Sequence, residues 1–166
     1  MKTRHVIILD EGLEYTLNSK EKTASVRCEG NCKDFLEGEI FMPQTIRYKD
    51  KDYTVNYIPL MGFAGCDKIT KVIIPPTIDR LLRSTFEYCS DLVYVEIPAS
   101  VKIFLPNIFF GCKNLKRIVF ENLKESNSNT EEFNLNEEVF NGCNPEVIIE
   151  DKATGNEFRI ADILKL

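Results

Sequence analysis

The chain has 166 residues, a length typical of one domain. Its hydrophobic fraction of 43% is enough to build a core, which argues against a disordered chain. The net charge of −5 argues against binding to nucleic acid or to an anionic membrane, because both require a basic surface.

The N-terminal segment contains too few apolar residues for a secretory signal. Four apolar residues stand at positions 6–9, whereas the apolar part of a signal peptide has about 7–15. No stretch approaches the roughly 18 apolar residues of a membrane span. The protein therefore stays in the cytosol or lacks a leader, and the sequence leaves both open. His5 is the single histidine, which excludes a two-histidine metal site and leaves one candidate imidazole base.

Two β-hairpins and one strand are predicted in the first third of the chain. Residues 12–26 suggest one hairpin, with strands near 15–17 and 24–26. Residues 46–55 suggest a second hairpin, and residues 40–43 between them look like a strand that precedes the repeats described below. We expect these elements to cap the first coil, since the end of a stacked array exposes unpaired strand edges.

Cys28 and Cys32 are set apart from the other four cysteines. We expect unpaired thiols here, and the alternative is a small disulfide loop, which the short segment between the two cysteines allows in an oxidising compartment. A metal site would require two further ligands, which the sequence does not supply. We therefore predict no metal and no cofactor.

A regular repeat dominates the rest of the chain. Cys66, Cys89 and Cys112 are evenly spaced, and Cys143 follows at a longer interval, as expected for one more repeat with an insertion before it. Phenylalanine stands three positions before each cysteine, at Phe63, Phe86, Phe109 and Phe140. The period of about 23 residues falls within the range of roughly 20–29 residues of leucine-rich repeats, in which each coil buries its apolar side against the next.

Each repeat is predicted to contain one short strand and one turn. Residues 72–75 and 94–98 are rich in β-branched residues and end in proline, which cannot donate to a ladder, and residues 94–98 also alternate in polarity. Residues 84–89 indicate a single helical turn. The cysteines occur once per coil rather than in close pairs, so we interpret them as buried structural residues.

The fourth repeat departs from the others. A polar insertion near residues 124–132 is predicted to be a loop. Asn144-Pro145 follows the cysteine, and the strand-like residues 147–149 arrive about two positions early. Beyond Glu150, a turn near residues 154–156 and the run at 158–164 indicate a C-terminal cap.

Residues 35–150 resemble the BspA-like leucine-rich-repeat family. Residues 86–92 and 95–101 match its unit, in which a phenylalanine, a cysteine and an Ile-Pro pair recur together. The chain departs from the family seven positions before each cysteine, where glycine is common and Pro59, Leu82 and Leu105 stand here. The repeat and the resemblance predict an α/β fold, a right-handed leucine-rich-repeat solenoid with a mainly parallel β-sheet and an N-terminal β-hairpin cap.

Strand residues that point away from the core are the candidate binding residues. If Val72 faces inward, alternation places Lys71, Tyr94 and Arg117 in one outward column. The next outward column consists of Ile73, Glu96 and Val119. Neighbouring strands are about 4.8 Å apart, so each column forms a continuous strip. We name Lys71, Tyr94, Glu96 and Arg117 as the candidate site, because tyrosine and arginine are favoured at interfaces and two cations flank the ring. An ordinary solvated sheet face is the alternative.

A second candidate surface consists of apolar residues outside the strands. Several of them exposed together would mark a partner surface, whereas packing between coils is the alternative. They are Leu60, Met61, Leu82, Leu105 and Phe110.

The sequence contains no evident catalytic constellation. It has no glycine-rich phosphate loop and no Gly-x-Ser-x-Gly elbow, and no spacing selects one pair among its many carboxylates. We predict one domain over residues 1–166, with an N-terminal β cap at 1–43, repeats at 44–150 and a C-terminal cap at 151–166. Its predicted function is non-catalytic protein binding, and the resemblance implies adhesion or host-protein recognition at a bacterial surface. The alternatives are a carbohydrate-binding or hydrolytic accessory domain and a structural fragment of a larger repeat array.

Overall fold

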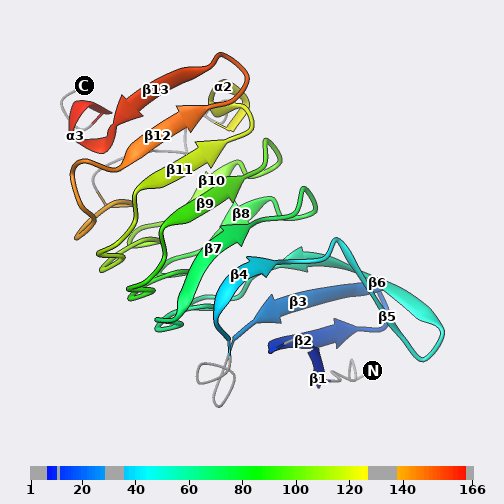
Figure 1. Cartoon of the computed structure of the whole chain (residues 1–166). Coiled ribbons are helices and arrows are strands. Elements are labelled where there is room, and N and C mark those ends of the chain that lie inside the picture. The colour runs from blue at the N-terminus through cyan, green and yellow to red at the C-terminus, as the bar shows by residue number, and fades with distance from the viewer. Residues whose placement is uncertain (1–6, 11, 29–35, 127–137, 164–166) are drawn as a thin grey trace.

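Three β-sheets organise the chain in the computed structural model, which describes residues 7–10, 12–28, 36–126 and 138–163 (Figure 1). A six-stranded sheet forms the spine of the stacked coils, and a five-stranded sheet lies at their N-terminal end. Across the spine the strands are, in order, β13 (Asn156–Arg159), β12 (Ile148–Asp151), β11 (Arg117–Phe120), β9 (Tyr94–Ile97), β7 (Ile69–Ile73) and β4 (Gly38–Phe41).

The strands of the spine stack in the register that the repeat predicts. β4, β7, β9, β11 and β12 pair in parallel, and β13 returns antiparallel to β12. Val72, Val95, Ile118 and Ile149 stand side by side, each six positions after its cysteine, and all four are buried. The predicted early arrival of the fourth strand is therefore wrong. The insertion precedes Cys143, so it leaves the spacing from cysteine to strand unchanged.

Asp151 occupies the position that is apolar in the preceding coils. It pairs with Phe120 in the register and is only 5% exposed. Its carboxylate accepts hydrogen bonds from the Thr154 hydroxyl at 2.7 Å and from the amides of Leu123 and Ala153. Burial raises the pKa of the Asp151 carboxyl, but these three donors outweigh it and leave the pKa below its ordinary value. The apolar column thus ends on a hydrogen-bonded carboxylate.

The turns between strands stack as regularly as the strands. The phenylalanine rings form a continuous column with centroid distances of 5.6 Å for Phe63–Phe86, 5.9 Å for Phe86–Phe109 and 6.3 Å for Phe109–Phe140. Backbone bonds such as Phe63 N to Thr85 O at 2.9 Å join each turn to the next. Each coil therefore supplies the stacking and hydrogen-bond partners of the coil beside it.

The repeat cysteines do more than fill space. The thiols of Cys89, Cys112 and Cys143 each donate a hydrogen bond of 3.1 Å to the carbonyl of the phenylalanine one coil earlier. Three of the repeat cysteines are fully buried, as the sequence predicts, whereas Cys143 is half-buried at the C-terminal end. A small side chain with a weak donor suits this position, because valine or alanine would leave the carbonyl without that bond.

The five-stranded sheet contains both predicted hairpins. Its order is β1 (Ile7–Asp10), β2 (Leu13–Asn18), β3 (Thr23–Arg27), β6 (Lys51–Tyr57) and β5 (Thr45–Tyr48). β2 pairs antiparallel with β3, and β5 with β6, while β3 and β6 run in parallel. Its inward side chains, including Tyr15, Leu17 and Val55, belong to the same apolar core as the repeats. The sheets are therefore mixed rather than parallel throughout.

Helices contribute little to the described structure. α2 (Leu123–Ser126) and α3 (Ile160–Ile163) have four residues each, so turns rather than helices carry the chain between strands. Neither offers an apolar stretch of the length that a bilayer crossing requires. A third sheet consists of β8 (Arg80–Leu81) and β10 (Ile103–Phe104), which pair in parallel one coil apart.

Candidate functional site

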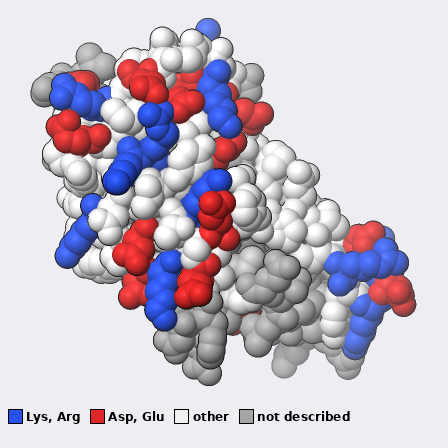
Figure 2. All heavy atoms as spheres, viewed as in Figure 1, with Lys and Arg blue, Asp and Glu red and all other residues white. Residues whose placement is uncertain are grey.

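The four predicted binding residues lie on the outer face of the six-stranded sheet. Lys71, Tyr94 and Arg117 are paired in register, and Glu96 lies in the adjacent column with Ile73. All four side chains are partly exposed. Acidic and basic side chains alternate over this sheet and do not gather into a patch of one sign (Figure 2).

Lys71 stands between two aromatic rings. Its Nζ atom lies 5.5 Å from the centroid of Tyr94 and 5.6 Å from that of Phe41, and 3.1 Å from the Glu39 carboxylate. Phe41, on β4, is 59% exposed. The lysine therefore combines a charge pair with two cation–π contacts on a surface that also offers a bare aromatic ring.

Tyr94 is tied to Glu96 on its own strand. The Tyr94 hydroxyl donates a hydrogen bond of 3.2 Å to the Glu96 carboxylate. Burial, followed by the charge of Glu96, raises the pKa of Tyr94 above its ordinary value. The phenol thus stays protonated and its ring stays uncharged over the whole neutral range.

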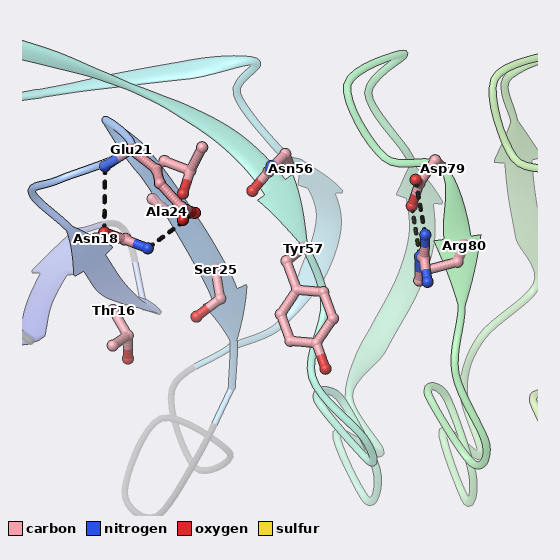
Figure 3. Close-up of a pocket in the computed structure, with 10 residues that line it drawn as sticks. Thr16, Asn18, Glu21, Ala24, Ser25, Asn56, Tyr57, Asp79 and Arg80 are labelled. Carbon is pink, nitrogen blue, oxygen red and sulfur yellow. Dashed lines mark hydrogen bonds and ion pairs between the residues drawn. The ribbon is translucent and has the colours of Figure 1, made fainter. Parts of the chain in front are cut away.

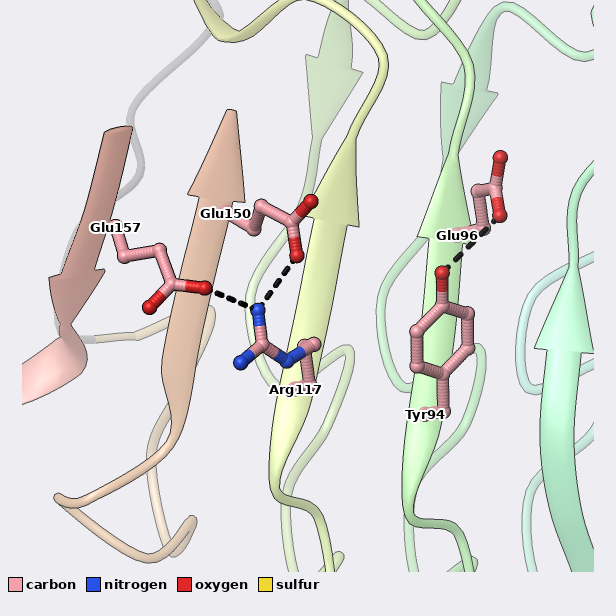
Figure 4. A network of polar contacts seen from close by, with 5 residues as sticks. All are labelled: Tyr94, Glu96, Arg117, Glu150 and Glu157. Atoms are coloured by element: carbon pink, nitrogen blue, oxygen red, sulfur yellow. Dashed lines mark hydrogen bonds and ion pairs between the residues drawn. The ribbon is translucent and has the colours of Figure 1, made fainter. Parts of the chain in front are cut away.

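Arg117 turns away from Tyr94 and toward the C-terminal strands (Figure 4). Its Nη1 atom donates to the carboxylates of Glu150 on β12 and Glu157 on β13. The hydrogen bond to Glu157, followed by that to Glu150, raises the pKa of the Arg117 guanidinium. The expected pair of cation–π contacts on Tyr94 therefore reduces to the one from Lys71.

A second ion pair covers Val119. Alternation predicts an outward Val119, and the register places it in the column of Glu96 and Glu150, yet it is 1% exposed. The expectation of an exposed side chain is wrong. Lys152, which follows β12, reaches Glu96 on β9 at 2.6 Å, so this pair passes over β11 between them. This ion pair therefore shields the Val119 side chain from solvent.

The face divides into two parts with different properties. We call the exposed Phe41 together with the half-buried Lys71, Ile73 and Tyr94 the open end. We call the residues of the ion-pair network the paired end, namely Glu96, Arg117, Glu150, Lys152 and Glu157. Phe41 is missing from the predicted site, although residues 40–43 are recognised as a strand, because the column of Ile73 and Glu96, to which the register assigns Phe41, is not extended to that strand.

The second predicted surface is only partly exposed. Leu60 and Met61 are exposed, whereas Leu82, Leu105 and Phe110 are half-buried. Tyr88 is missing from this predicted surface, yet it is 55% exposed and meets the Phe110 ring edge-on at 5.4 Å. Tyr88 has a φ of 58° at the position where other coils carry glycine, such as Gly65 and Gly111. The missing glycine is the signal that could have drawn attention to it.

The remaining candidates concern cysteine and histidine chemistry. Cys28 is buried, while Cys32 and His5 lie outside the described residues, so the choice between unpaired thiols and a Cys28–Cys32 disulfide stays untested. The described residues contain no group of three or more histidine, cysteine or acidic side chains placed to hold a metal ion. Burial raises the pKa of Cys143 to about 12, which keeps this thiol protonated.

Comparisons with known proteins agree with this geometry. Residues 36–153 match the BspA type leucine rich repeat region, with six copies. A leucine-rich repeat protein from Bacteroides ovatus is 28% identical, with a TM-score of 0.58 over 86% of this chain. One from Bacteroides capillosus is 18% identical, with a TM-score of 0.62 over 83% of this chain and 94% of its own. These likenesses show a leucine-rich repeat fold.

Coverage is uneven among the similar structures. The chain spans only 36% of the Bacteroides ovatus protein. A leucine rich cell surface protein from Faecalibacterium prausnitzii is 22% identical, with a TM-score of 0.52 over 89% of this chain and 45% of its own. No curated protein matches the chain.

Proposed function

The chain belongs to the BspA-type leucine-rich repeat family, and on this basis we propose that it is a non-catalytic module that binds a protein partner through the open end of its six-stranded sheet. We propose one domain, with a cap at residues 1–43, repeats at 44–150 and a C-terminal cap at 151–166. We also propose a right-handed winding, because crossovers between parallel strands of one sheet are right-handed in about 98% of cases.

The exposed Phe41 ring beside Lys71 and Tyr94 is the observation that carries the proposal. An aromatic side chain on the outer face of a sheet adds nothing to the core beneath it, and its exposure is unfavourable in water. Aromatic residues are enriched at interface centres, where a surrounding shell excludes water. A partner that covers Phe41 would also strengthen the cation–π contacts of Lys71 by removing solvent from them.

The paired end supports the same location by contrast. Its charged groups already satisfy one another, as Lys71 and Glu39 do beside the open end, but the open end adds the exposed Phe41 ring, which a partner can cover without breaking an ion pair. We therefore move the centre of the predicted site from Arg117 toward β4 and β7. The partner surface should present apolar groups to Phe41 and Ile73 and a hydrogen-bond acceptor to Lys71.

We extend the proposal to adhesion at a bacterial surface, which is the role that the family resemblance implies. One similar structure is described as a cell surface protein of Faecalibacterium prausnitzii, and the chain covers 45% of it. A broad sheet face is suited to recognising a macromolecule, whereas small substrates are bound in enclosed clefts.

A comparative capture experiment tests the proposal. Immobilised wild-type protein, the double variant Phe41→Ala/Tyr94→Ala and the control Tyr88→Ala would be exposed to bacterial and host surface proteins, with quantification by mass spectrometry. We expect partners retained by the wild type and by Tyr88→Ala to fall at least about tenfold on the double variant, which corresponds to about 1.4 kcal/mol. Equal retention by all three folded proteins would contradict the location. Tyr88 is a matched control because it is an exposed aromatic residue outside this sheet.

A further inference from the structure

We propose that a hollow beside the five-stranded sheet is a second binding site, for a neutral carbohydrate (Figure 3). The hollow has a volume of about 460 Å³ and lies between strands β2, β3 and β6 on one side and Asp79 and Arg80, at the start of β8, on the other. It shares no residue with the open end or the paired end. This site goes beyond the proposed protein-binding function and does not depend on it.

One wall of the hollow carries short, uncharged polar side chains. They occupy outward positions that alternate with the buried Leu17, Ala24 and Val26. Hydroxyl and amide groups both donate and accept hydrogen bonds, as do the hydroxyls of a sugar. The wall consists of Thr16, Asn18, Thr23, Ser25 and Asn56.

A β-bulge adds an aromatic ring to this polar wall. Ala24 pairs with Val55, but Ser25 pairs with Tyr57, so Asn56 is the extra residue. Strict alternation would turn Tyr57 inward after the outward Asn56, whereas the bulge places it beside Ser25 on the outer face. The Tyr57 side chain is 40% exposed, and Figure 3 shows its ring between the sheet and the next coil. Such a ring can stack against the apolar C–H face of a sugar while its hydroxyl remains wet.

The opposite wall is an exposed carboxylate–guanidinium pair. Arg80 donates through Nε to one oxygen of Asp79 at 2.8 Å and through Nη2 to the other at 3.1 Å. This pairing with Arg80 lowers the pKa of the Asp79 carboxyl, so it is ionised at neutral pH. Asp79 and Arg80 stand one full repeat after Asn56 and Tyr57, so the two walls are equivalent positions of consecutive coils.

The charge balance selects a neutral ligand. The charged side chains of the lining are Glu21, Asp79 and Arg80, which leave one net negative charge. The Glu21 carboxylate accepts a hydrogen bond of 3.0 Å from the Asn18 amide, which holds it at the rim. Sialylated, sulfated and phosphorylated ligands would be repelled, while the polar lining disfavours a mainly apolar molecule. A hexose or deoxyhexose unit of a neutral oligosaccharide has the required hydroxyls and an apolar ring face.

Saturation-transfer NMR on the intact chain tests the site. The probes are neutral oligosaccharides ending in galactose, glucose, mannose, fucose or N-acetylglucosamine, with a sialylated oligosaccharide as the charged comparison. We expect transfer to at least one neutral probe and none to the sialylated one. Tyr57→Ala should weaken that binding at least about tenfold, while Tyr57→Phe, which keeps the ring, should retain most of it.

Two further variants make the outcome decisive. Tyr88→Ala removes an exposed tyrosine elsewhere and should bind like the wild type, whereas Asp79→Asn should bind more weakly because it disturbs the paired wall. Circular dichroism would verify that each variant is folded, as expected for substitutions at exposed positions. Absence of transfer to every neutral probe, preference for the sialylated probe, or unchanged binding by folded Tyr57→Ala would overturn the proposal. None of these results would affect the protein-binding proposal, which the variants of Phe41 and Tyr94 test.

Discussion

The open end and the paired end occupy equivalent positions on one sheet but differ in what their side chains do. At the paired end, Arg117 binds carboxylates on β12 and β13, and the ion pair between Lys152 and Glu96 passes over β11 and covers Val119. At the open end, Lys71 meets two rings, and the exposed Phe41 has no such cover. Charged residues at both ends have counter-charges, since Lys71 also pairs with Glu39 on β4. The two ends differ because the open end carries the exposed Phe41 ring, whereas the ion pairs of the paired end cover the apolar Val119.

The difference also separates binding from stability. Half-exposed ion pairs contribute only about 0–1 kcal/mol each, so the network at the paired end is a weak source of stability. It can still hold β12 and β13 against the solenoid and exclude water from Val119. Substitutions in the core and at each end should therefore have distinct consequences for stability and for binding.

The phenylalanine column joins the coils that carry both ends, so a break in this column should destabilise both ends together. Phe86→Ala removes a fully buried ring that stacks on Phe63 and Phe109. We expect a loss of about 3–5 kcal/mol in the free energy of unfolding, measured by chemical denaturation. Phe41→Ala, at an exposed ring, is the control and should change stability by less than about 0.5 kcal/mol. An unchanged midpoint for Phe86→Ala would refute the stacking.

Asp151 lies beneath the paired end, and its substitution should lower the free energy of unfolding there. Asp151→Asn replaces the charged acceptor of the hydrogen bonds from Thr154, Leu123 and Ala153 by a neutral one. We expect this change to lower the free energy of unfolding by about 1–3 kcal/mol. The folded pKa of Asp151 lies below that of the unfolded chain, so the carboxylate stabilises fully above about pH 4. The stabilisation is lost as pH falls through the folded pKa. Denaturation of both proteins from pH 7 to pH 3 should show their difference shrinking, and a constant difference would contradict this.

Single substitutions should distinguish the two ends in binding. With a partner in hand, titration calorimetry should show that Tyr94→Ala loses about 1–2 kcal/mol of affinity. Arg117→Ala should stay within about 0.5 kcal/mol, because its guanidinium is already engaged by Glu150 and Glu157. The opposite ranking would relocate the site to the paired end.

The cysteine column offers a comparison that needs no mutation. Cys66, Cys89 and Cys112 are fully buried, whereas Cys143 is half-buried at the C-terminal end. Burial raises the pKa of Cys112 and Cys143, so all should react slowly while the protein is folded, with Cys143 the first of the four. Peptide mapping after timed labelling measures this order. Faster labelling of Cys112 than of Cys143 would show that the chain opens from its middle.

The features that repeat along the chain were predictable from its sequence. The regular period predicted the phenylalanine and cysteine columns, the strand register of Lys71, Tyr94 and Arg117, and the face that carries them. It did so because each coil contacts its neighbours through the same positions, so one period encodes all these contacts. Turn and strand patterns likewise placed both N-terminal hairpins.

The features that occur once became visible in the folded chain alone. Glu157 reaches Arg117 because β13 folds back antiparallel, across 40 residues of sequence, and no period announces that contact. The bulge that exposes Tyr57 depends on how β3 and β6 align as separate hairpins join one sheet. The burial of Val119 depends on a lysine two strands away from its ion-pair partner. Such contacts are set by long-range packing and by the competition of each charge for a counter-charge, which local spacing in the sequence does not encode.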